Sequence, residues 1–350
     1  MSLRNAFTMG LAAAATVLAG GPGLGGAAQA AELVAAMPGA LLGPVLAQAF
    51  LQPFTKATGI AVDSLPFDGT VEAARAGHAD LAVVDGPVLF DGCKSGAFAK
   101  LDWDKLGGRA LALPQTASDC GTGAVLRSTV LAWNRDKFTG TPTWAEFWDV
   151  AKVPGKRGLH RGARYNLEIA LLADGVAPGD IYGTLRTDAG IDRAFRKLDQ
   201  LKPYVVWWTD PNEAPRLLAS GDVLMTSAAA DHIIAVVRST DPQARHNFAV
   251  QWSGAIDEVE SWAILAGSPN IPAATKLLAF AADPKVQHAL PALGAFGGAT
   301  IGADDKLPPE LLAVSPSTPA NLAGGLMVDE SFWHDNGAKL DKQFDAWVAK

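Results

Sequence analysis

Two acidic residues in the second half of the chain have a spacing that could hold a cation. Glu258 and Glu260 flank Val259, in a segment that continues into Ser261 and Trp262. Side chains alternate along an extended strand, so both carboxylates would point to the same side. Paired acids in a closing site suit an amine, whose lost hydration must be replaced by charge-assisted hydrogen bonds. A solvated strand end is the alternative, and the pattern alone leaves both interpretations open.

Aromatic and basic residues offer further candidates. The chain has ten tryptophans against three tyrosines. Trp207, Trp208, Trp252 and Trp262 lie at or near expected strand ends, where a large ring serves equally well as a ligand platform or as core packing. A basic stretch over residues 152–164 could recognise an anion, although such a run is more often a solvated loop face.

Motifs for catalysis and for metal binding are missing from the sequence. There is no Gly-x-Ser-x-Gly elbow, His-Glu-x-x-His, phosphate-binding glycine loop with Lys-Ser/Thr, or Cys-x-x-Cys pair, and the six histidines have no ligand spacing. A dinucleotide-type glycine pattern at residues 21–26 follows no strand. Missing motifs favour binding over catalysis, so we expect no catalytic residue, no metal and no cofactor.

The first 30 residues have the order of a secretory signal peptide. Arg4 is followed by an apolar, Gly/Ala-rich stretch over residues 6–26 and by the small-residue site Ala28-Gln29-Ala30. We expect cleavage after Ala30 and a periplasmic location. Without this segment, the 29 cations and 36 acids become 28 and 36, a net charge of −8. This mildly acidic balance does not indicate a nucleic-acid partner.

Cys93 and Cys120 are the two cysteines of the chain. An even pair in an exported protein predicts a disulfide. Two separate buried thiols are the alternative. A metal site is disfavoured, because the nearest histidines, His78 and His160, have no ligand spacing with the cysteines.

Hydrophobic periodicity predicts the elements that must position these groups. The N-terminal part alternates in the order strand 32–36, helix 40–58, strand 60–62, helix 71–77 and strand 79–84. This order predicts an α/β fold with a mostly parallel sheet flanked by helices. Ligands collect at the carboxyl ends of such strands, where Met37 and Asp85 lie.

The rest of the chain predicts a second domain and connections to it. The apolar run 125–133 is long enough to cross between two lobes, and segments 248–252 and 261–265 predict strands of a return crossing. Helical patterns cover 189–201 and 332–348. About 320 residues after the leader suggest two domains.

Short motifs occur in a specific order along the chain after the leader. They are Cys93 with Leu101-Asp102-Trp103, Cys120-Gly121, and the segments 128–134, 147–150, 153–159, 167–175, 217–223, 261–264 and 332–336. In this order they resemble the periplasmic spermidine/putrescine-binding proteins and the wider group of ABC-transporter extracellular solute-binding proteins.

The resemblance implies a two-lobed periplasmic binding protein fold of type II, with hinge strands crossing between the lobes. It places lobe 1 in residues 31–122 and 253–300, lobe 2 in residues 123–252, and C-terminal helices over 301–350 that pack on lobe 2 and the hinge. It also implies a monomeric substrate-binding component of an ABC importer, which delivers a small solute to the permease in the inner membrane and performs no chemistry.

The resemblance also implies a site. Glu260 falls where polyamine binders place an acid against an amine, so we expect an organic, polyamine-like cation. The expected ligand-binding residues are the counter-charges Glu260, Asp231 and Asp85, the apolar walls Trp208, Trp262 and Phe296, and Met37 in the first loop.

Several positions depart from the polyamine binders. The first loop, often aromatic in the family, is 37–42 here, and the segment 227–230 holds only Ser and Ala where those proteins place a ring. The changes enlarge the cleft and make it more apolar. A bulkier apolar or an anionic solute in the same fold is therefore an alternative, and a secreted hydrolase or transferase is the alternative of another class.

Overall fold

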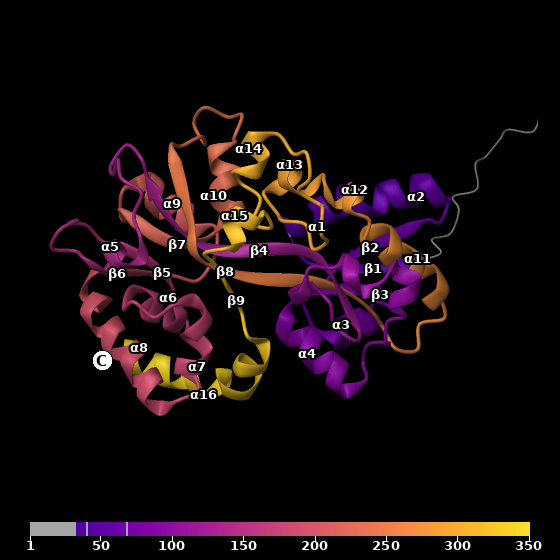
Figure 1. The fold of residues 1–350 in the computed structure, drawn as a ribbon, viewed down its shortest axis with the longest axis horizontal. Coiled ribbons are helices and arrows are strands. Elements are labelled where there is room, and N and C mark those ends of the chain that lie inside the picture. Colours follow the sequence, from indigo (N-terminus) through magenta and orange to yellow (C-terminus); the bar gives the residue numbers. More distant parts are fainter. Residues whose placement is uncertain (1–32, 40, 68) are drawn as a thin grey trace, which may run out of the picture. The chain divides into compact units, whose positions relative to one another are not determined.

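The computed structural model describes residues 33–39, 41–67 and 69–350 (Figure 1). The expected signal peptide, residues 1–30, lies outside the described residues. None of the described helices is both long and apolar enough to cross a membrane.

A single mixed sheet runs through the molecule in the strand order β2-β1-β3-β8-β4-β7-β5-β6, with β9 beside β8. Its strands are β1 (Leu33–Met37), β2 (Val62–Pro66), β3 (Leu81–Val84), β4 (Gly121–Asn134), β5 (Arg157–His160), β6 (Val205–Trp208), β7 (Met225–Ala229), β8 (Phe248–Ile264) and β9 (Leu326–Met327). We call the part around β1, β2 and β3 lobe 1 and the part around β5, β6 and β7 lobe 2.

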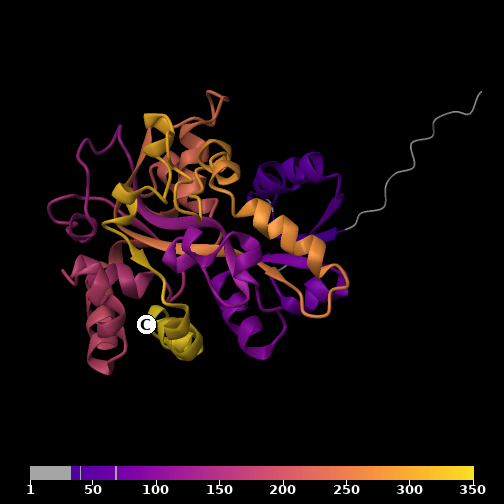
Figure 2. The ribbon, with the colours of Figure 1, turned by 45° about the vertical axis from the view of Figure 1, so that its right-hand side comes forward.

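The two longest strands connect the lobes. β4 and β8 run antiparallel to each other across the middle of both views, and their pairing extends from Gly121 opposite Ala263 to Asn134 opposite Phe248 (Figures 1 and 2). In the lobes β1 pairs in parallel with β2 and β3, and β5 with β6 and β7. The expected mostly parallel sheet is therefore correct within the lobes, and the expected crossing and return strands form the antiparallel pair at the centre. A chain that crosses from lobe 1 to lobe 2 and returns must run in opposite directions there.

Helices cover both faces of the sheet (Figure 2). They are α1 (Leu42–Leu46), α2 (Gln52–Thr58), α3 (Val71–Ala76), α4 (Gly86–Ser95), α5 (Trp144–Trp148), α6 (Asn166–Ala173), α7 (Ile181–Leu185), α8 (Asp188–Leu201), α9 (Glu213–Ser220), α10 (Ala230–Val237), α11 (Ile271–Ala281), α12 (Pro284–Gln287), α13 (Leu290–Gly294), α14 (Pro309–Leu312), α15 (Pro319–Leu322) and α16 (Glu330–Val348). A π-helical turn, Ala47–Leu51, joins α1 to α2.

Each lobe has its own hydrophobic core. In lobe 1, Phe50, Phe54, Trp262 and Phe296 are buried together. The core of lobe 2 includes the apolar face of α8 and four residues of α16, namely Phe332, Trp333, Leu340 and Phe344. The C-terminal helix is thus packed on lobe 2. Helix amphipathicity explains this, because the apolar stripe of each helix must be covered.

Cys93 and Cys120 form a disulfide, which confirms the prediction. Cys93 lies in the last turn of α4, and Cys120 directly precedes β4. Their Cα atoms are 5.9 Å apart. The bond attaches the end of a lobe 1 helix to the start of a strand that leaves for lobe 2.

Candidate functional site

A cavity of about 430 Å³ lies where strands and helices of both lobes approach one another. It is lined by Pro38, Gly39, Leu41 and Leu42 after β1, by Arg127 of β4, by Asn212 before α9, by Asp231 and His232 of α10, and by Glu260 of β8. We call it the Arg127 cavity. It combines an apolar wall from lobe 1 with charged side chains from the hinge strands and lobe 2.

Arg127 stands between two acids of this cavity. Its Nη1 atom lies 3.3 Å from Oε1 of Glu260, and its Nη2 atom lies 3.4 Å from Oδ2 of Asp231. Charge-assisted N–H···O bonds are usually about 2.7–2.9 Å long, so both contacts are long. The Nε atom of Arg127 is buried and donates to no other described residue. The guanidinium therefore keeps hydrogen-bonding capacity toward a further acceptor.

Burial and charge set the protonation of the two acids in opposite directions. Burial raises the pKa of Glu260 to about 7, although the positive charge of Arg127 opposes this shift. Burial also acts to raise the pKa of Asp231, but His232 and Arg127 together hold it below its usual value. Near neutral pH, Asp231 is thus the ionised partner of Arg127, and Glu260 titrates.

A second arginine, Arg164, contacts two other acids. Arg164 donates two hydrogen bonds to the carboxylate of Glu330, at 2.7 and 2.9 Å, and its Nη2 atom is 3.8 Å from Glu258. The hydroxyl of Tyr165 donates to Oε2 of Glu258 at 2.6 Å. Glu258 and Glu260 therefore contact different arginines, Arg164 and Arg127.

The structure brings some of the expected site residues together. Glu260 and Asp231 share the Arg127 cavity. Met37 ends β1 and lines a neighbouring cavity of about 300 Å³. Asp85 is exposed at the start of α4, where its side chain accepts a hydrogen bond from the backbone N–H of Val88 at 3.0 Å.

The expected aromatic walls have other surroundings. Trp262 and Phe296 have no exposed surface and belong to the core of lobe 1, where Trp262 meets Phe50 edge-on at 5.9 Å between ring centroids. Trp208 is buried in lobe 2 beneath α9 and α10. Their rings contribute core packing, and apolar residues of the first loop, such as Leu41, form the cavity wall instead.

Arg127 and Arg164 were not among the expected site residues. Arg127 is the single charged residue of the apolar run 125–133, and a lone cation in a buried strand needs a partner. That signal was present in the sequence. Arg164 belongs to the basic stretch 152–164, whose members have different surroundings in the structure. Arg157, for example, is fully buried and donates only to backbone carbonyls.

Neither metal binding nor nucleophilic chemistry is indicated by these contacts. No group of three or more His, Cys, Asp or Glu side chains within the described part of the chain could hold a metal ion. What the Arg127 cavity offers is one strong cation and two acids of different pKa within reach of a single small molecule.

Comparison with known proteins gives the family context. The model of a family described as bacterial extracellular solute-binding protein matches residues 49–311. A 4-aminobutanoate (GABA)-binding protein of Pseudomonas aeruginosa is 38% identical over 310 residues, which cover 87% of each chain.

Solved structures agree with this match. An ABC transporter substrate-binding protein of Bradyrhizobium japonicum is 28% identical with a TM-score of 0.80, and the match covers 91% of this chain and 99% of the other. The Atu4243 GABA receptor is 25% identical with a TM-score of 0.76, covering 91% and 98% of the two chains. The two-lobed fold and the wider family of the resemblance are thereby confirmed, whereas its spermidine/putrescine branch is not.

Proposed function

The chain belongs to the family of bacterial extracellular solute-binding proteins, and as the substrate-binding component of an ABC transporter it requires a solute, which we propose to be a small zwitterion with one ammonium and one carboxylate group, of the GABA type. The same proposal places the mature protein in the periplasm as a monomer that delivers this solute to a permease. The role is binding and release, without chemistry on the solute.

The position of Arg127 between Asp231 and Glu260 carries the proposal. A polyamine would bring two or more positive charges against a guanidinium at the centre of the cavity. Two like charges 4 Å apart repel by about 4 kcal/mol at the effective dielectric constant of a partly buried site. A zwitterion avoids this cost, because its carboxylate can accept from Arg127 while its ammonium donates to an acid.

The relatives support the same class of solute. One curated relative is a GABA-binding protein and one solved relative is a GABA receptor. The small residues of this chain at 227–230, where polyamine binders place a ring, also argue against a polyamine. An anionic solute would add a negative charge beside the ionised Asp231, and a bulkier apolar solute would offer that acid no ammonium group.

Lobe closure would couple binding to recognition by the permease. Arg127 and Glu260 lie on the crossing strands, Leu41 on lobe 1 and Asp231 on lobe 2, so a solute bound to all of them bridges both lobes. Solute then favours the closed form, because only that form provides every contact. An ammonium beside Glu260 would also favour its ionised form and release a proton near pH 7.

Three four-carbon compounds test the charge pattern at constant length. Putrescine carries two ammonium groups, GABA carries one ammonium and one carboxylate, and succinate carries two carboxylates. In calorimetric titrations of the mature protein, we expect GABA to bind at least about tenfold more tightly than either of the others. Putrescine binding as tight as that of GABA would overturn the proposal of a zwitterionic solute and favour a polyamine-like cation instead.

A further inference from the structure

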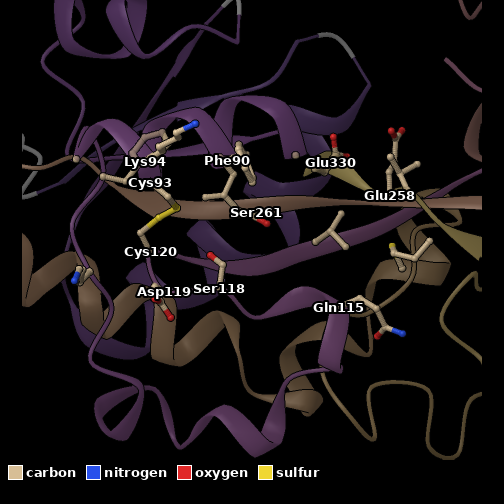
Figure 3. Close-up of a pocket in the computed structure, with 18 residues that line it drawn as sticks. Phe90, Cys93, Lys94, Gln115, Ser118, Asp119, Cys120, Glu258, Ser261 and Glu330 are labelled. Carbon is tan, nitrogen blue, oxygen red and sulfur yellow. A yellow bond between two sulfur atoms is a disulfide. The ribbon is translucent and has the colours of Figure 1, made fainter. Parts of the chain in front are cut away.

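A second and larger cavity, of about 570 Å³, is lined by residues of α4, β8 and β9 and by the disulfide (Figure 3). Glu258, Val259 and Ser261 line this second cavity, whereas Glu260 lines the first, so the two glutamates expected on one side of the strand lie in different cavities. Its volume falls in the usual range of small-molecule sites, about 300–1,000 Å³. We call it the hinge cavity.

The walls of the hinge cavity are mainly apolar. They comprise Leu89 and Phe90 of α4, Phe98, the Cys93–Cys120 disulfide, Val259 of β8, and Met327 and Val328 at β9. Figure 3 shows Phe90 above the strand and the disulfide at one end. A flat or aliphatic body fits such a lining, since most small-molecule sites combine apolar walls with a few polar groups.

The charges of the hinge cavity are not balanced. The acids Glu258 and Glu330 already contact Arg164, and Asp119 pairs with Arg109 at 3.1 Å.

Lys94 and Lys100 line the same cavity, and neither forms an ion pair with any residue that the structure describes. Lys94 lies beside Cys93, so it stands close to the disulfide end. Lys94 and Lys100 are therefore the cations of this lining that remain available for charge-assisted bonds with a carboxylate or sulfonate.

We propose that the hinge cavity is a second binding site, which takes a small organic anion with an apolar body, such as a medium-chain or aromatic carboxylate. Its ligand class differs from that of the Arg127 cavity, where the solute needs an ammonium group. The apolar body lies against Phe90 and Val259, and the anionic group is held by Lys94 and Lys100.

Occupation of this site is coupled to the movement of the lobes. One wall is α4 of lobe 1, and the facing wall is β9 with the start of α16, a helix that packs in the core of lobe 2. Rotation about β4 and β8 must change the distance between these walls. A bound anion therefore shifts the affinity of the Arg127 cavity, and the solute shifts that of the anion by the same factor. This coupling rests on the proposed function, whereas the site itself does not.

The test uses 8-anilinonaphthalene-1-sulfonate, an anion with an apolar body whose fluorescence increases in apolar surroundings. We expect saturation at one probe per mature chain. The double variant Lys94→Glu/Lys100→Glu should weaken binding at least about tenfold, while Lys56→Glu/Lys276→Glu, at two exposed lysines of α2 and α11 with the same total change of charge, should leave it unchanged. Unaltered binding in the double variant overturns the proposal.

Two further experiments test which cavity holds the probe and which charge the site prefers. Leu41→Trp narrows the Arg127 cavity at an exposed position, so probe binding should be unchanged. If this variant alone lost probe binding, the probe would bind in the Arg127 cavity, and the second site would be overturned. Octanoate should displace the probe and octylamine should not. Equal displacement by octylamine would overturn the anion class. Thermal melts of each variant verify the fold, and the GABA titration reports separately on the proposed function.

Discussion

Arg127 holds together charges that would otherwise repel one another. Glu260 comes from the crossing strand β8 and Asp231 from α10 of lobe 2, and the guanidinium contacts both. Neither acid has a second arginine or lysine within ion-pair distance among the described residues. Arg127 therefore links both acids of its cavity, and any solute must compete with or replace part of its contacts.

Glu260→Gln tests this residue with almost no change of size. We expect GABA affinity to fall about 30-fold or more, because losing one partner of a desolvated charge pair costs roughly 2–5 kcal/mol. Thermal stability should change little, since burial already raises the pKa of Glu260 to about 7 and its ionisation is costly. Titration calorimetry measures the affinity. Glu72→Gln, on the exposed side of α3, is the matched control, and equal GABA affinity in Glu260→Gln would remove Glu260 from the site.

A buried acid that lines neither cavity predicts how stability depends on pH. Glu168 is fully buried in α6, and its Oε1 atom accepts hydrogen bonds from Tyr182 Oη at 2.9 Å and from Trp333 Nε1 at 2.7 Å. Burial raises the pKa of Glu168 from 4.5 to about 7. The folded state thus binds a proton more tightly than the unfolded state. This contribution is fully present below pH 4.5 and is lost as the pH rises through about 7.

Glu168→Gln keeps the accepting oxygen and removes the titration. From pH 5 to pH 8 we expect the free energy of unfolding of the wild type to fall relative to that of the variant, by about 3 kcal/mol at most. Urea denaturation at the two pH values measures the difference. If the difference in the free energy of unfolding between the two proteins were the same at both pH values, Glu168 would not titrate in this range.

At the scale of elements, the disulfide restrains α4 against β4. Cys93 and Cys120 are 27 positions apart, and closing a loop of that size stabilises by roughly 3–4 kcal/mol in the chain-entropy model. Cys93→Ala with Cys120→Ala should lower the free energy of unfolding by an amount of this order, measured by urea denaturation. Reductant should lower the stability of the wild type and leave the double variant unchanged. A reductant effect on both proteins would indicate another cause.

The sequence predicted many elements but not their extent. Strands near 32–36 and 79–84 and the helix near 189–201 were expected, because their apolar patterns are simple and local. The segments 248–252 and 261–265 were expected as separate strands, but both belong to the 17-residue strand β8. The intervening residues include Gly254 and several acids, which weaken a strand pattern, and only pairing with β4 extends the strand through them.

The candidate site was predictable only where a residue belongs to a local sequence pattern. Glu260 could be found because it lies in a local pattern and matches a family position. Its pairing with Arg127 depends on contact between residues 133 positions apart, and that of Asp231 on residues 104 apart. Such contacts follow from strand register, which one sequence does not specify. The aromatic rings were misplaced because a strand-end tryptophan has the same sequence pattern in a core and in a cleft.

At the scale of the whole molecule, the solute should draw the lobes together. Leu41 lies after β1, in lobe 1, and Asp231 in lobe 2, and a GABA molecule that contacts both would favour the closed form. We expect the radius of gyration from small-angle X-ray scattering to fall on addition of saturating GABA and to stay constant with succinate. Binding without any change in scattering would separate recognition from closure.

The path of β4 and β8 also determines the order in which a growing or exported chain can complete its parts. Lobe 2 is formed largely by consecutive residues between these strands, but its core also includes α16 near the end of the chain. Lobe 1 must wait, because β3 pairs on one side with residues 261–264 of β8. Until those residues arrive, one edge of β3 offers unpaired backbone groups, which are a template for aggregation. A chain stalled before residue 261 would therefore carry an open-edged lobe 1 beside a lobe 2 that still lacks α16, the form that most needs a chaperone.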